Sequence, residues 1–316
     1  MPHFKTVHFY TTKYVLNLTR ALSQLFLQYF KILTSNITCD EILTPERVLH
    51  NRNNPTELLF ILIPQVTVTR GDALPDVNKY CLYQLEQLND KTCNGTLVKT
   101  DFNEMLQSLI TNSIATFDYS EINMTYYPVQ LQSKVRILPI PVYVCAHNVA
   151  PLPTPSTYNP YKSDILFYGG MNPRREKILT RVIDALHREH GYKVLVVNQV
   201  FGDELLKYIL NTRVVLNLHY YPNSILETER IHTALQFNHV KIVSEYPTQR
   251  DKLLPIYDAS SRILFCDEIG DNNTPDLVTA ACLSALSSPC ASAATGKPFI
   301  ATLNYLCVDA LRNHIF

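Results

Sequence analysis

The chain is poor in the features that assign a function at first sight. It has no excess of either charge, because 28 lysines and arginines balance 28 aspartates and glutamates, so no net field draws it to nucleic acid or to an anionic membrane. No run approaches the about 18 apolar residues of a membrane-spanning helix, and the N-terminus lacks the basic start and unbroken apolar stretch of a signal peptide. We therefore expect a cytoplasmic protein without a transmembrane segment, in which any anion site is local.

The motifs of several common enzyme classes are also absent. The chain has no G-x-x-x-x-G-K-[ST], no G-x-S-x-G and no H-E-x-x-H, which argues against a P-loop kinase, an α/β-hydrolase and a zinc protease. It has no G-x-G-x-x-G, which argues against a nucleotide-cofactor oxidoreductase. The eight cysteines show neither C-x-x-C spacing nor histidines at zinc-finger distance. We expect reduced, mostly buried thiols.

The chain is long enough for two domains of ordinary size. With 316 residues, 46% of them hydrophobic, the chain can bury roughly three quarters of its unfolded surface. We expect an N-terminal lobe over residues 1–148, a linker over 149–162, a C-terminal lobe over 163–298, and a C-terminal helix over 299–316 that packs back on the lobes. The linker is marked by four prolines that rule out a regular element, which are Pro151, Pro153, Pro155 and Pro160.

Strands and helices alternate through the C-terminal lobe. Short apolar runs predict strands, and helical periodicity fills the intervals between them. Asn172 is expected to cap a helix that begins at Pro173 and ends by Gly191, and Thr274 with Pro275 to open a later helix. Such alternation is typical of a parallel, doubly wound sheet. The expected strands cover residues 164–168, 193–198, 214–218, 241–244 and 262–267.

The N-terminal lobe is less regular but also alternates. We expect a long amphipathic helix over residues 12–33 and a helix near 102–110, with strands over 58–63, 80–84 and 113–117. The economical interpretation is a second Rossmann-like lobe. The expected fold class is therefore α/β, with two Rossmann-like lobes and a cleft between them of the kind in which ligands bind.

Residues 214–245 carry the clearest functional signal. A buried strand is followed by the polar loop 219–223, and Ser224 with Glu227 has the S-x-x-E spacing of a helix capping box. At about 100° per residue, Glu227 and Arg230 fall on the inward face of this helix. The residues expected to point outward are Glu229, His232 and Gln236.

An acid and a base then lie beside the carboxyl end of a strand, where parallel sheets bind ligands. A carboxylate there can accept hydrogen bonds from ribose hydroxyls, and a guanidinium with free helix amides can hold a diphosphate. The alternative is that Glu227 only completes the capping box and that Arg230 pairs with it.

A glycine pair marks a second candidate for anion binding. Gly169 and Gly170 follow a predicted strand and lead into a helix whose first turns carry Arg174 and Arg175. This arrangement favours a diphosphate cradle. The alternative is an ordinary tight turn.

These residues together carry a resemblance to a known family. The segments ILFYGGMNPRREKIL, VVLNLHYY, ILETERI and IVSE, in this order and spacing, resemble the nucleotide-binding lobe of the two-Rossmann (GT-B) glycosyltransferases of the group 1 type. In the first half, YCLYQLEQL and ATFDYS are similar to acceptor-side motifs of that family. The resemblance covers residues 80–245. It implies a transferase that uses a nucleotide sugar as substrate and needs no other cofactor.

The resemblance also implies roles for single residues. Glu227 would face ribose or sugar hydroxyls, and Arg230 would neutralise the leaving diphosphate, a task that metal ions perform in other enzymes, so no metal is required. The chain departs from the family at Ala234, near where many related transferases place the second glutamate of an E-x7-E pattern, which leaves Glu227 alone for the ribose. The other residues expected at the donor are Gly169, Gly170, Asn172, Arg174, Arg175, His219, Tyr220 and Asn223.

A catalytic base is expected from the N-terminal lobe if the reaction inverts the anomeric centre. Asp118 and Glu86 are the candidates; the alternatives are that Asp118 caps a helix and that Glu86 is a polar residue at a strand end. A retaining reaction needs no such base, and the sequence does not choose between the two outcomes. His147 is either an acceptor-site group or, as we expect, an exposed loop residue. No role is expected for His187, His190, His232 and His239.

The favoured function is a metal-independent glycosyltransferase that moves a hexosyl or pentosyl group from a nucleotide sugar to an acceptor hydroxyl. Two alternatives stay open, a catalytically inactive nucleotide or sugar-nucleotide binding protein on the same fold and a different enzyme, such as an epimerase, on this architecture. A glycan, a lipid-linked sugar, a small molecule and a modified base are all compatible acceptors. Neither the donor nor the oligomeric state follows from the sequence.

Overall fold

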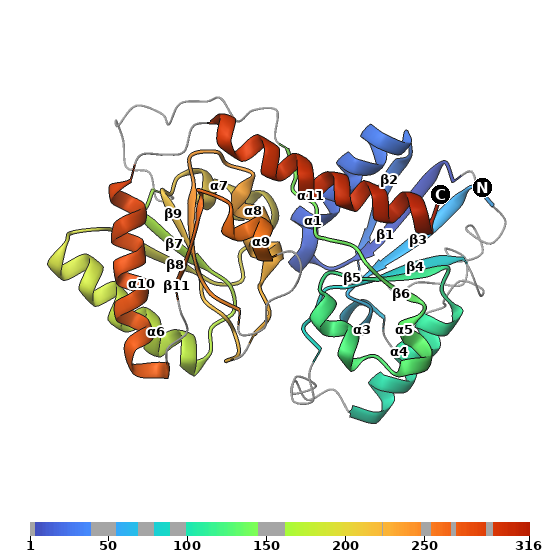
Figure 1. Ribbon diagram of the computed structural model, residues 1–316, viewed down its shortest axis with the longest axis horizontal. Coiled ribbons are helices and arrows are strands. Elements are labelled where there is room, and N and C mark those ends of the chain that lie inside the picture. Colours follow the sequence, from blue (N-terminus) through green and yellow to red (C-terminus); the bar gives the residue numbers. More distant parts are fainter. Residues whose placement is uncertain are drawn as a thin grey trace. The chain divides into compact units, whose positions relative to one another are not determined.

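The structure, a computed structural model, forms two compact units (Figure 1). The first comprises Met1–Pro141 and Thr302–Phe316, and the second comprises Val142–Ala301. The predicted linker over 149–162 lies outside the described residues except for Lys162, as does His147. The described residues are 4–38, 55–68, 79–88, 99–144, 162–222, 224–247, 254–266, 270–288 and 293–316.

A parallel six-stranded sheet forms the core of the first unit. Its strand order is β2-β1-β3-β4-β5-β6. The predicted strand over 80–84 is confirmed residue for residue, and the strands over 58–63 and 113–117 are confirmed with shifts of one or two residues at their ends. The strands are β1 (Thr6–Thr11), β2 (Leu33–Thr38), β3 (Glu57–Leu62), β4 (Tyr80–Gln84), β5 (Ala115–Asp118) and β6 (Val135–Ile137).

Aromatic side chains fill the centre of this unit. Phe9, Phe26 and Phe60 are fully buried and meet edge to face, and Phe60 stacks on Phe117 with ring centroids 5.9 Å apart. Such ring pairs add to the free energy of burial, so they fix the helix that carries Phe26 against the sheet. The helices are α1 (Leu16–Leu25), α3 (Pro64–Thr67), α4 (Lys99–Asn112), α5 (Val129–Gln132) and, from Thr302 onward, α11 (Ala293–His314).

The predicted helix over residues 12–33 is confirmed between Lys13 and Phe30, where a 3-10 turn (Lys13–Val15) leads into α1, but its predicted end at Leu33 is wrong. After α1 the chain makes a π-helical turn over Phe26–Phe30, and Lys31 then takes a left-handed backbone (φ 59°) that ends the helix. Leu33 can therefore begin β2. Neither β1 nor β2 is predicted from the sequence. β2 is the edge strand of the sheet and is largely exposed, so it lacks the apolar pattern that marks a strand.

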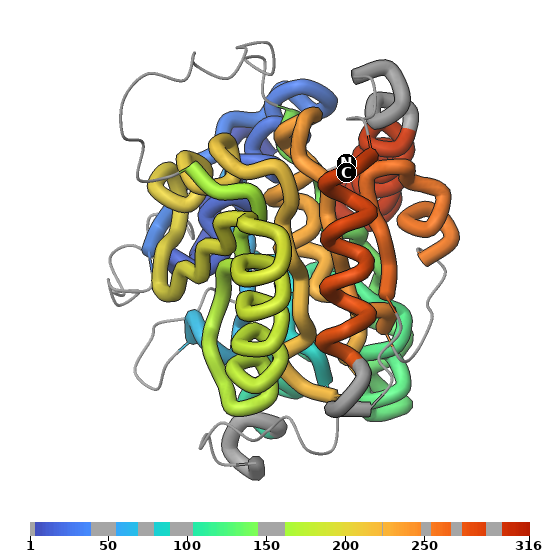
Figure 2. The backbone as a smooth tube through the Cα atoms, turned by 90° about the vertical axis from the view of Figure 1, so that its left-hand side faces the viewer, coloured from blue at the N-terminus to red at the C-terminus, as the bar shows by residue number. Residues whose placement is uncertain are grey.

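The second unit contains a parallel five-stranded sheet of order β11-β10-β9-β7-β8. Helices α6 and α10 lie side by side on it, as Figure 2 shows from the side. The strands are β7 (Ile165–Tyr168), β8 (Val194–Val197), β9 (Val214–Asn217), β10 (Lys241–Glu245) and β11 (Ile263–Cys266). The helices are α6 (Pro173–Asp184), α7 (Gly202–Leu210), α8 (Thr228–Leu235), α9 (Leu254–Asp258), α10 (Gly270–Ser287) and the first part of α11.

The predictions for the second unit are mostly confirmed. All five predicted strands agree to within one residue at either end, and Asn172 caps α6 through a bond from the backbone N–H of Arg175 to its side chain. The prediction that Thr274 and Pro275 open a helix is wrong, because α10 begins at Gly270 and holds Pro275 inside. The α/β fold class with two Rossmann-like units is confirmed.

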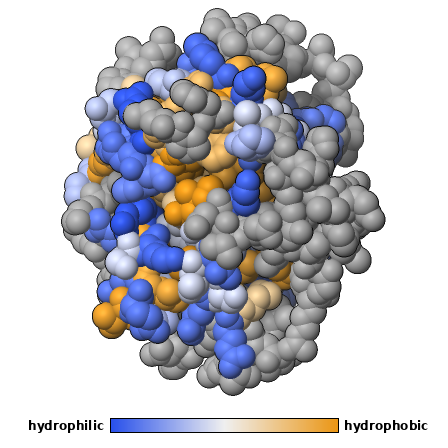
Figure 3. Space-filling model, turned by 90° about the vertical axis from the view of Figure 1, so that its right-hand side faces the viewer, coloured by the Kyte–Doolittle hydropathy of each residue, from blue (hydrophilic) through white to orange (hydrophobic). Residues whose placement is uncertain are grey.

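The face of the molecule drawn in Figure 3 mixes hydrophilic and hydrophobic side chains. Exposed apolar side chains scattered in this way are normal on a folded chain. Within the described ranges, none of the helices is both long enough and apolar enough to cross a membrane.

Candidate functional site

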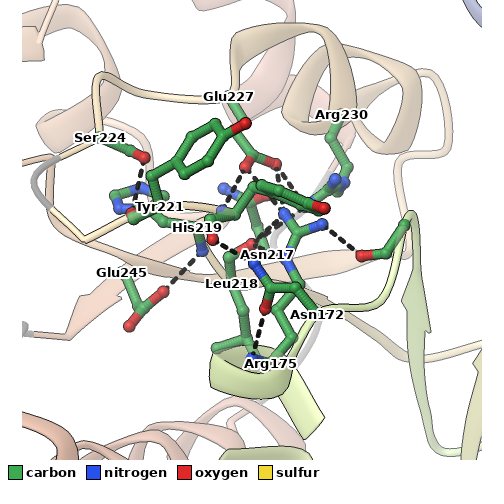
Figure 4. A network of polar contacts seen from close by, with 12 residues as sticks. Asn172, Arg175, Asn217, Leu218, His219, Tyr221, Ser224, Glu227, Arg230 and Glu245 are labelled. Carbon is green, nitrogen blue, oxygen red and sulfur yellow. Dashed lines mark hydrogen bonds and ion pairs between the residues drawn. The ribbon is translucent and has the colours of Figure 1, made fainter. Parts of the chain in front are cut away.

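The candidate site lies at the carboxyl ends of β7 and β9. From β7 the chain passes to β8 on one side, and it then returns to place β9 on the other side of β7, so these two neighbours form the switch point of the sheet. Open α/β sheets bind ligands at such points. The turn Gly169-Gly170 follows β7, and the loop from Leu218 follows β9 (Figure 4).

Glu227 is the central anion of the site. Its Oε1 atom accepts from Arg175 Nη2 at 2.8 Å and from the backbone N–H of Tyr220 at 2.9 Å. Its Oε2 atom accepts from Arg175 Nη2 at 3.0 Å and forms an ion pair with Arg230 Nη1 at 2.5 Å. Burial disfavours the charged carboxylate, but Arg230 and Arg175 outweigh it and hold the pKa of Glu227 below its usual value. Glu227 is therefore ionised at neutral pH.

The predicted capping box is wrong. α8 begins at Thr228, with Glu227 as the N-cap residue, and the Glu227 side chain makes no capping hydrogen bond. The hydroxyl of Ser224 instead donates to the carbonyl of Tyr221 at 2.7 Å. Two guanidinium groups bind a carboxylate more strongly than helix amides do, so the ion pairs decide where the Glu227 side chain goes.

Arg175 is a buried connector between the two loops of the site. Only 1% of this residue is exposed. Its Nε and Nη2 atoms donate to the carbonyl of Leu218, and its Nη1 donates to the carbonyl of Gly170 at 2.7 Å. Its guanidinium lies between the rings of Phe167 and Tyr220. Burial lowers its pKa to about 10, which leaves the group charged at neutral pH. Its donors are taken by the protein, so it holds the loops together.

Arg230 presents its guanidinium to the glycine turn. Nη1 donates to Asn217 Oδ1 at 2.9 Å and to the carbonyl of Leu218 at 3.2 Å. Gly169 has φ +135°, and a Cβ atom at that residue would stand 2.6 Å from Arg230 Nη2. Only glycine meets both requirements. The missing side chain at Gly169 therefore leaves room for the Arg230 guanidinium above the turn that follows β7. A diphosphate cradle requires such a cationic group.

A second ion pair, Arg174 with Glu245, supports the same loop. The Arg174 guanidinium contacts both Glu245 oxygens, at 2.5 and 3.1 Å, and donates to the carbonyl of His219 at 2.9 Å. Glu245 is fully buried and also accepts from the backbone N–H of His219 at 2.6 Å. No role is predicted for Glu245 from the sequence. The feature that could have identified it is a charged residue at the end of the buried strand β10.

The charges of this group do not cancel. Three arginines, Arg174, Arg175 and Arg230, face two glutamates, Glu227 and Glu245, so by formal charge these five residues carry one excess positive charge. The side chains of Arg174 and Arg230 are 12% and 13% exposed, whereas that of Arg175 is 1% exposed. An anion that approaches the site can therefore reach Arg174 or Arg230 but not Arg175.

The remaining donor-side candidates form the walls of the site. Asn172 donates from Nδ2 to the carbonyl of Tyr220, and the Tyr220 ring is partly exposed over Gly170. The His219 ring is buried, and its two nitrogens have no hydrogen-bond partner among the described residues. Burial lowers the pKa of His219, so it is neutral at pH 7. Asn223 lies outside the described residues.

Two residues expected on the outer face of α8 are buried. His232 is 2% exposed, and its Nε2 is 2.7 Å from the hydroxyl of Tyr257 on α9, while Gln236 is 4% exposed. Glu229 is half-buried and accepts from the Thr233 hydroxyl at 3.1 Å. Burial raises the pKa of Glu229 to about 7. For His232 the prediction fails because Tyr257 of α9 lies against a position that periodicity alone assigns to solvent.

The two candidate bases belong to the first unit. Asp118, the last residue of β5, is fully buried and accepts from Ser120 N, Asn123 Nδ2 and the Tyr127 hydroxyl at 2.9, 2.9 and 2.7 Å. Burial raises its pKa to about 7. The helix that follows is capped by Ser120, not by Asp118. Glu86 is exposed, and its carbonyl accepts from Asn123 Nδ2 at 2.9 Å.

Metal ligands do not gather in the described parts of the chain. No group of three or more His, Cys, Asp or Glu side chains lies close enough there to hold a metal ion. The four cysteines that the structure describes, Cys81, Cys266, Cys282 and Cys307, are free and buried.

The fold of the chain resembles that of several solved structures. An α-glucosyltransferase in complex with UDP-glucose and DNA containing an abasic site has a TM-score of 0.52 at 10% identity, over 98% of this chain and 95% of that chain. AviGT4, a glycosyltransferase involved in avilamycin A biosynthesis, has a TM-score of 0.53 at 10% identity, over 98% of this chain and 95% of that chain. Sucrose-phosphate synthase from Thermosynechococcus elongatus has a TM-score of 0.50 at 11% identity, over 98% of this chain and 94% of that chain. No protein-family model and no curated protein matches the sequence.

The chain therefore has the GT-B fold. Two Rossmann-like units make up this architecture, and the predicted resemblance is confirmed at the level of the fold. The structures named above that share the fold are glycosyltransferases or a synthase of a sugar phosphate. At about 10% identity, the likeness gives no residue-level assignment in the present chain.

Proposed function

We propose that the protein is a glycosyltransferase that moves a sugar from a nucleotide-sugar donor to an acceptor hydroxyl. The observation that carries this proposal is the guanidinium of Arg230, which is directed at the Gly169 turn at the switch point of the second sheet. Positive charge above an open backbone turn suits a diphosphate. The GT-B fold also supports the proposal, because it is shared with an α-glucosyltransferase in complex with UDP-glucose and with a glycosyltransferase involved in avilamycin A biosynthesis.

In the proposed reaction, the bond between the anomeric carbon and the diphosphate oxygen breaks, and a bond from that carbon to the acceptor oxygen forms. The acceptor proton passes to a base or to the leaving phosphate. Arg230 stabilises the negative charge that develops on the diphosphate. Asn217 and Glu227 contact Nη1 and orient the guanidinium toward the turn before the donor arrives. On this proposal the reaction requires no metal.

On the acceptor side we propose Glu86 as the base of an inverting reaction. Its side chain is exposed, whereas Asp118 is buried and already accepts from three donors. Asp118 would then act as a positioning residue, because Asn123 bonds both its carboxylate and the carbonyl of Glu86. A retaining reaction would not need Glu86 as a base.

We also propose a cytoplasmic location, on the grounds of cysteine usage. Cys81 and Cys282 are completely buried thiols within the two cores, and burial raises the pKa of Cys81 to about 12. Reduced cysteines in cores are the usual state of chains that fold in a reducing compartment.

A thermal-shift panel tests the donor site. The wild type, Arg230→Ala and a control, Arg188→Ala, are heated with UDP, GDP, ADP, TDP and their sugars, with and without a divalent cation. Arg188 is a suitable control because its side chain is 76% exposed and forms an exposed ion pair with Asp184, four residues earlier in the chain. We expect the nucleotides of one nucleobase to raise the melting temperature of the wild type and of the control. In Arg230→Ala this rise should be absent.

Turnover decides between the enzyme and an inactive binding protein. The second candidate is favoured by Ala234, which lies near the place where many related transferases carry another glutamate. An enzyme releases the nucleoside diphosphate from its donor, and Arg230→Ala and Glu227→Ala reduce that release. Binding without hydrolysis or transfer would support the inactive protein, and unchanged turnover in both variants would exclude the proposed site.

A further inference from the structure

The contacts of Glu227 show that its carboxylate has no free capacity. Two oxygens offer about four lone-pair positions. Four contacts from Arg175 Nη2, Arg230 Nη1 and the backbone N–H of Tyr220 occupy them. A ribose or sugar hydroxyl can therefore bond to Glu227 only after one of these donors turns to another partner.

Arg230 is the donor that can turn away. The other two partners of Glu227 are fixed, because Arg175 is buried and also bonded to the carbonyls of Leu218 and Gly170, and the N–H of Tyr220 belongs to the backbone. Arg230 is the more exposed of the two arginines that pair with Glu227. A phosphate at the Gly169 turn would compete for the same guanidinium.

The competing carboxylate does not leave when a phosphate arrives. Arg175 and Tyr220 keep Glu227 where it is, so an incoming anion meets a fixed negative charge next to Arg230. Like charges placed side by side weaken binding strongly. A ligand overcomes this effect if it also brings hydroxyl groups that donate to the Glu227 oxygen that Arg230 has released.

We propose that Glu227 is a specificity-determining residue that makes the site reject bare phosphate and pyrophosphate and accept a diphosphate joined to a hydroxyl-bearing sugar. This inference rests on the proposed use of the site for a nucleotide sugar. The diphosphate takes Arg230, and a hydroxyl of the same ligand takes the vacated position on Glu227. The two halves of the ligand thus bind with positive coupling.

Inorganic pyrophosphate is the probe that separates the two halves. Titration calorimetry compares wild type with Glu227→Gln, in which the retained Oε1 still accepts from Tyr220 and Arg175 while the amide faces Arg230 and repels it. We expect pyrophosphate to bind Glu227→Gln at least about tenfold more tightly than wild type. The preference for UDP, GDP, ADP or TDP over pyrophosphate should fall by at least about tenfold.

Two further variants keep the test decisive. Glu227→Asp keeps the charge on a shorter side chain, and we expect a smaller gain in pyrophosphate affinity. Adding Arg230→Gln to Glu227→Gln should remove the gain, which places the anion at Arg230. Equal or weaker pyrophosphate binding by folded Glu227→Gln or Glu227→Asp overturns the proposal. A gain with pyrophosphate but no binding of any nucleotide sugar would show that Glu227 excludes bare anions, and it would refute both the acceptance of a sugar diphosphate and the proposed function.

Discussion

Arg230 Nη2 lies so close to Gly169 that a methyl group on that residue would stand 2.6 Å from it. The contact joins the first residue after β7 with the first turn of α8, two segments about sixty residues apart in the chain. The Tyr168 hydroxyl, which donates to the carbonyl of Arg230 at 2.7 Å, ties the same two segments a second time. The position of the cation thus depends on the backbone of the turn below it.

Gly169→Ala should displace Arg230 and weaken donor binding. The new Cβ meets the guanidinium, and φ +135° is strained for any other residue. We expect a loss of about 1–3 kcal/mol in the free energy of unfolding and at least about tenfold weaker nucleotide binding. Gly191→Ala is the matched control, because it also has positive φ (+71°) but nothing within 4 Å of a new Cβ. Equal loss of binding in both variants would contradict the role of the contact.

Arg175→Lys should destabilise the second unit. A lysine keeps the charge but loses the planar fork that reaches Leu218, Gly170 and Glu227 together. We expect the free energy of unfolding to fall by about 3 kcal/mol, because the partners are left buried. Arg181→Lys, at an exposed ion pair with Asp276, should change it by less than about 0.5 kcal/mol. Urea unfolding measures both, and a stable Arg175→Lys would show that charge alone suffices.

Glu229 should make the protein less stable as the pH rises. Burial raises its pKa from 4.5 to about 7 in the folded chain, so the folded state binds the proton more tightly than the unfolded state. The contribution of Glu229 is fully favourable below pH 4.5 and is lost as the pH rises to about 7, a change of about 3 kcal/mol. Glu229→Gln, which still accepts from Thr233, should flatten this part of the pH profile of unfolding. Glu204→Gln, at an exposed pair, should leave it unchanged.

Tyr257→Phe should weaken the contact between α9 and α8. The variant keeps the ring but removes the partner of His232 Nε2, which is buried. We expect the free energy of unfolding to fall by about 1–3 kcal/mol, the penalty for a buried polar atom left without a bond. Tyr246→Phe, whose hydroxyl makes an exposed bond to Asp258, is the control and should cost less. If the two variants behave alike, the His232 bond adds nothing to stability.

Local patterns predict the parts of the fold that local interactions decide. The strand Tyr80–Gln84 is confirmed without shift because it is a short run whose residues are all buried, and Asn172 caps α6 because its side chain needs only the amide of Arg175, three residues on. Both signals are complete within a few residues. The same holds for the five strands of the second unit.

The errors arise where a distant partner competes with the local one. Ser224 and Glu227 have the spacing of a capping box, but the guanidinium of Arg175, 52 residues away, binds the carboxylate instead. His232 looks exposed until α9 brings Tyr257 over it. Glu245 is overlooked because its partner, Arg174, lies 71 residues earlier. Spacing within a helix cannot report such contacts.

The first turn of α6 imposes a strict limit on chain length. Arg174 and Arg175 are adjacent, yet they serve carboxylates from different parts of the fold, Glu245 and Glu227. Inserting or deleting one residue between Asn172 and Arg174 would rotate both side chains by about 100° around the helix. Each guanidinium would then miss its carboxylate, and two glutamates would each lose one arginine partner at once. Length changes should therefore be tolerated far less in this turn than substitutions are.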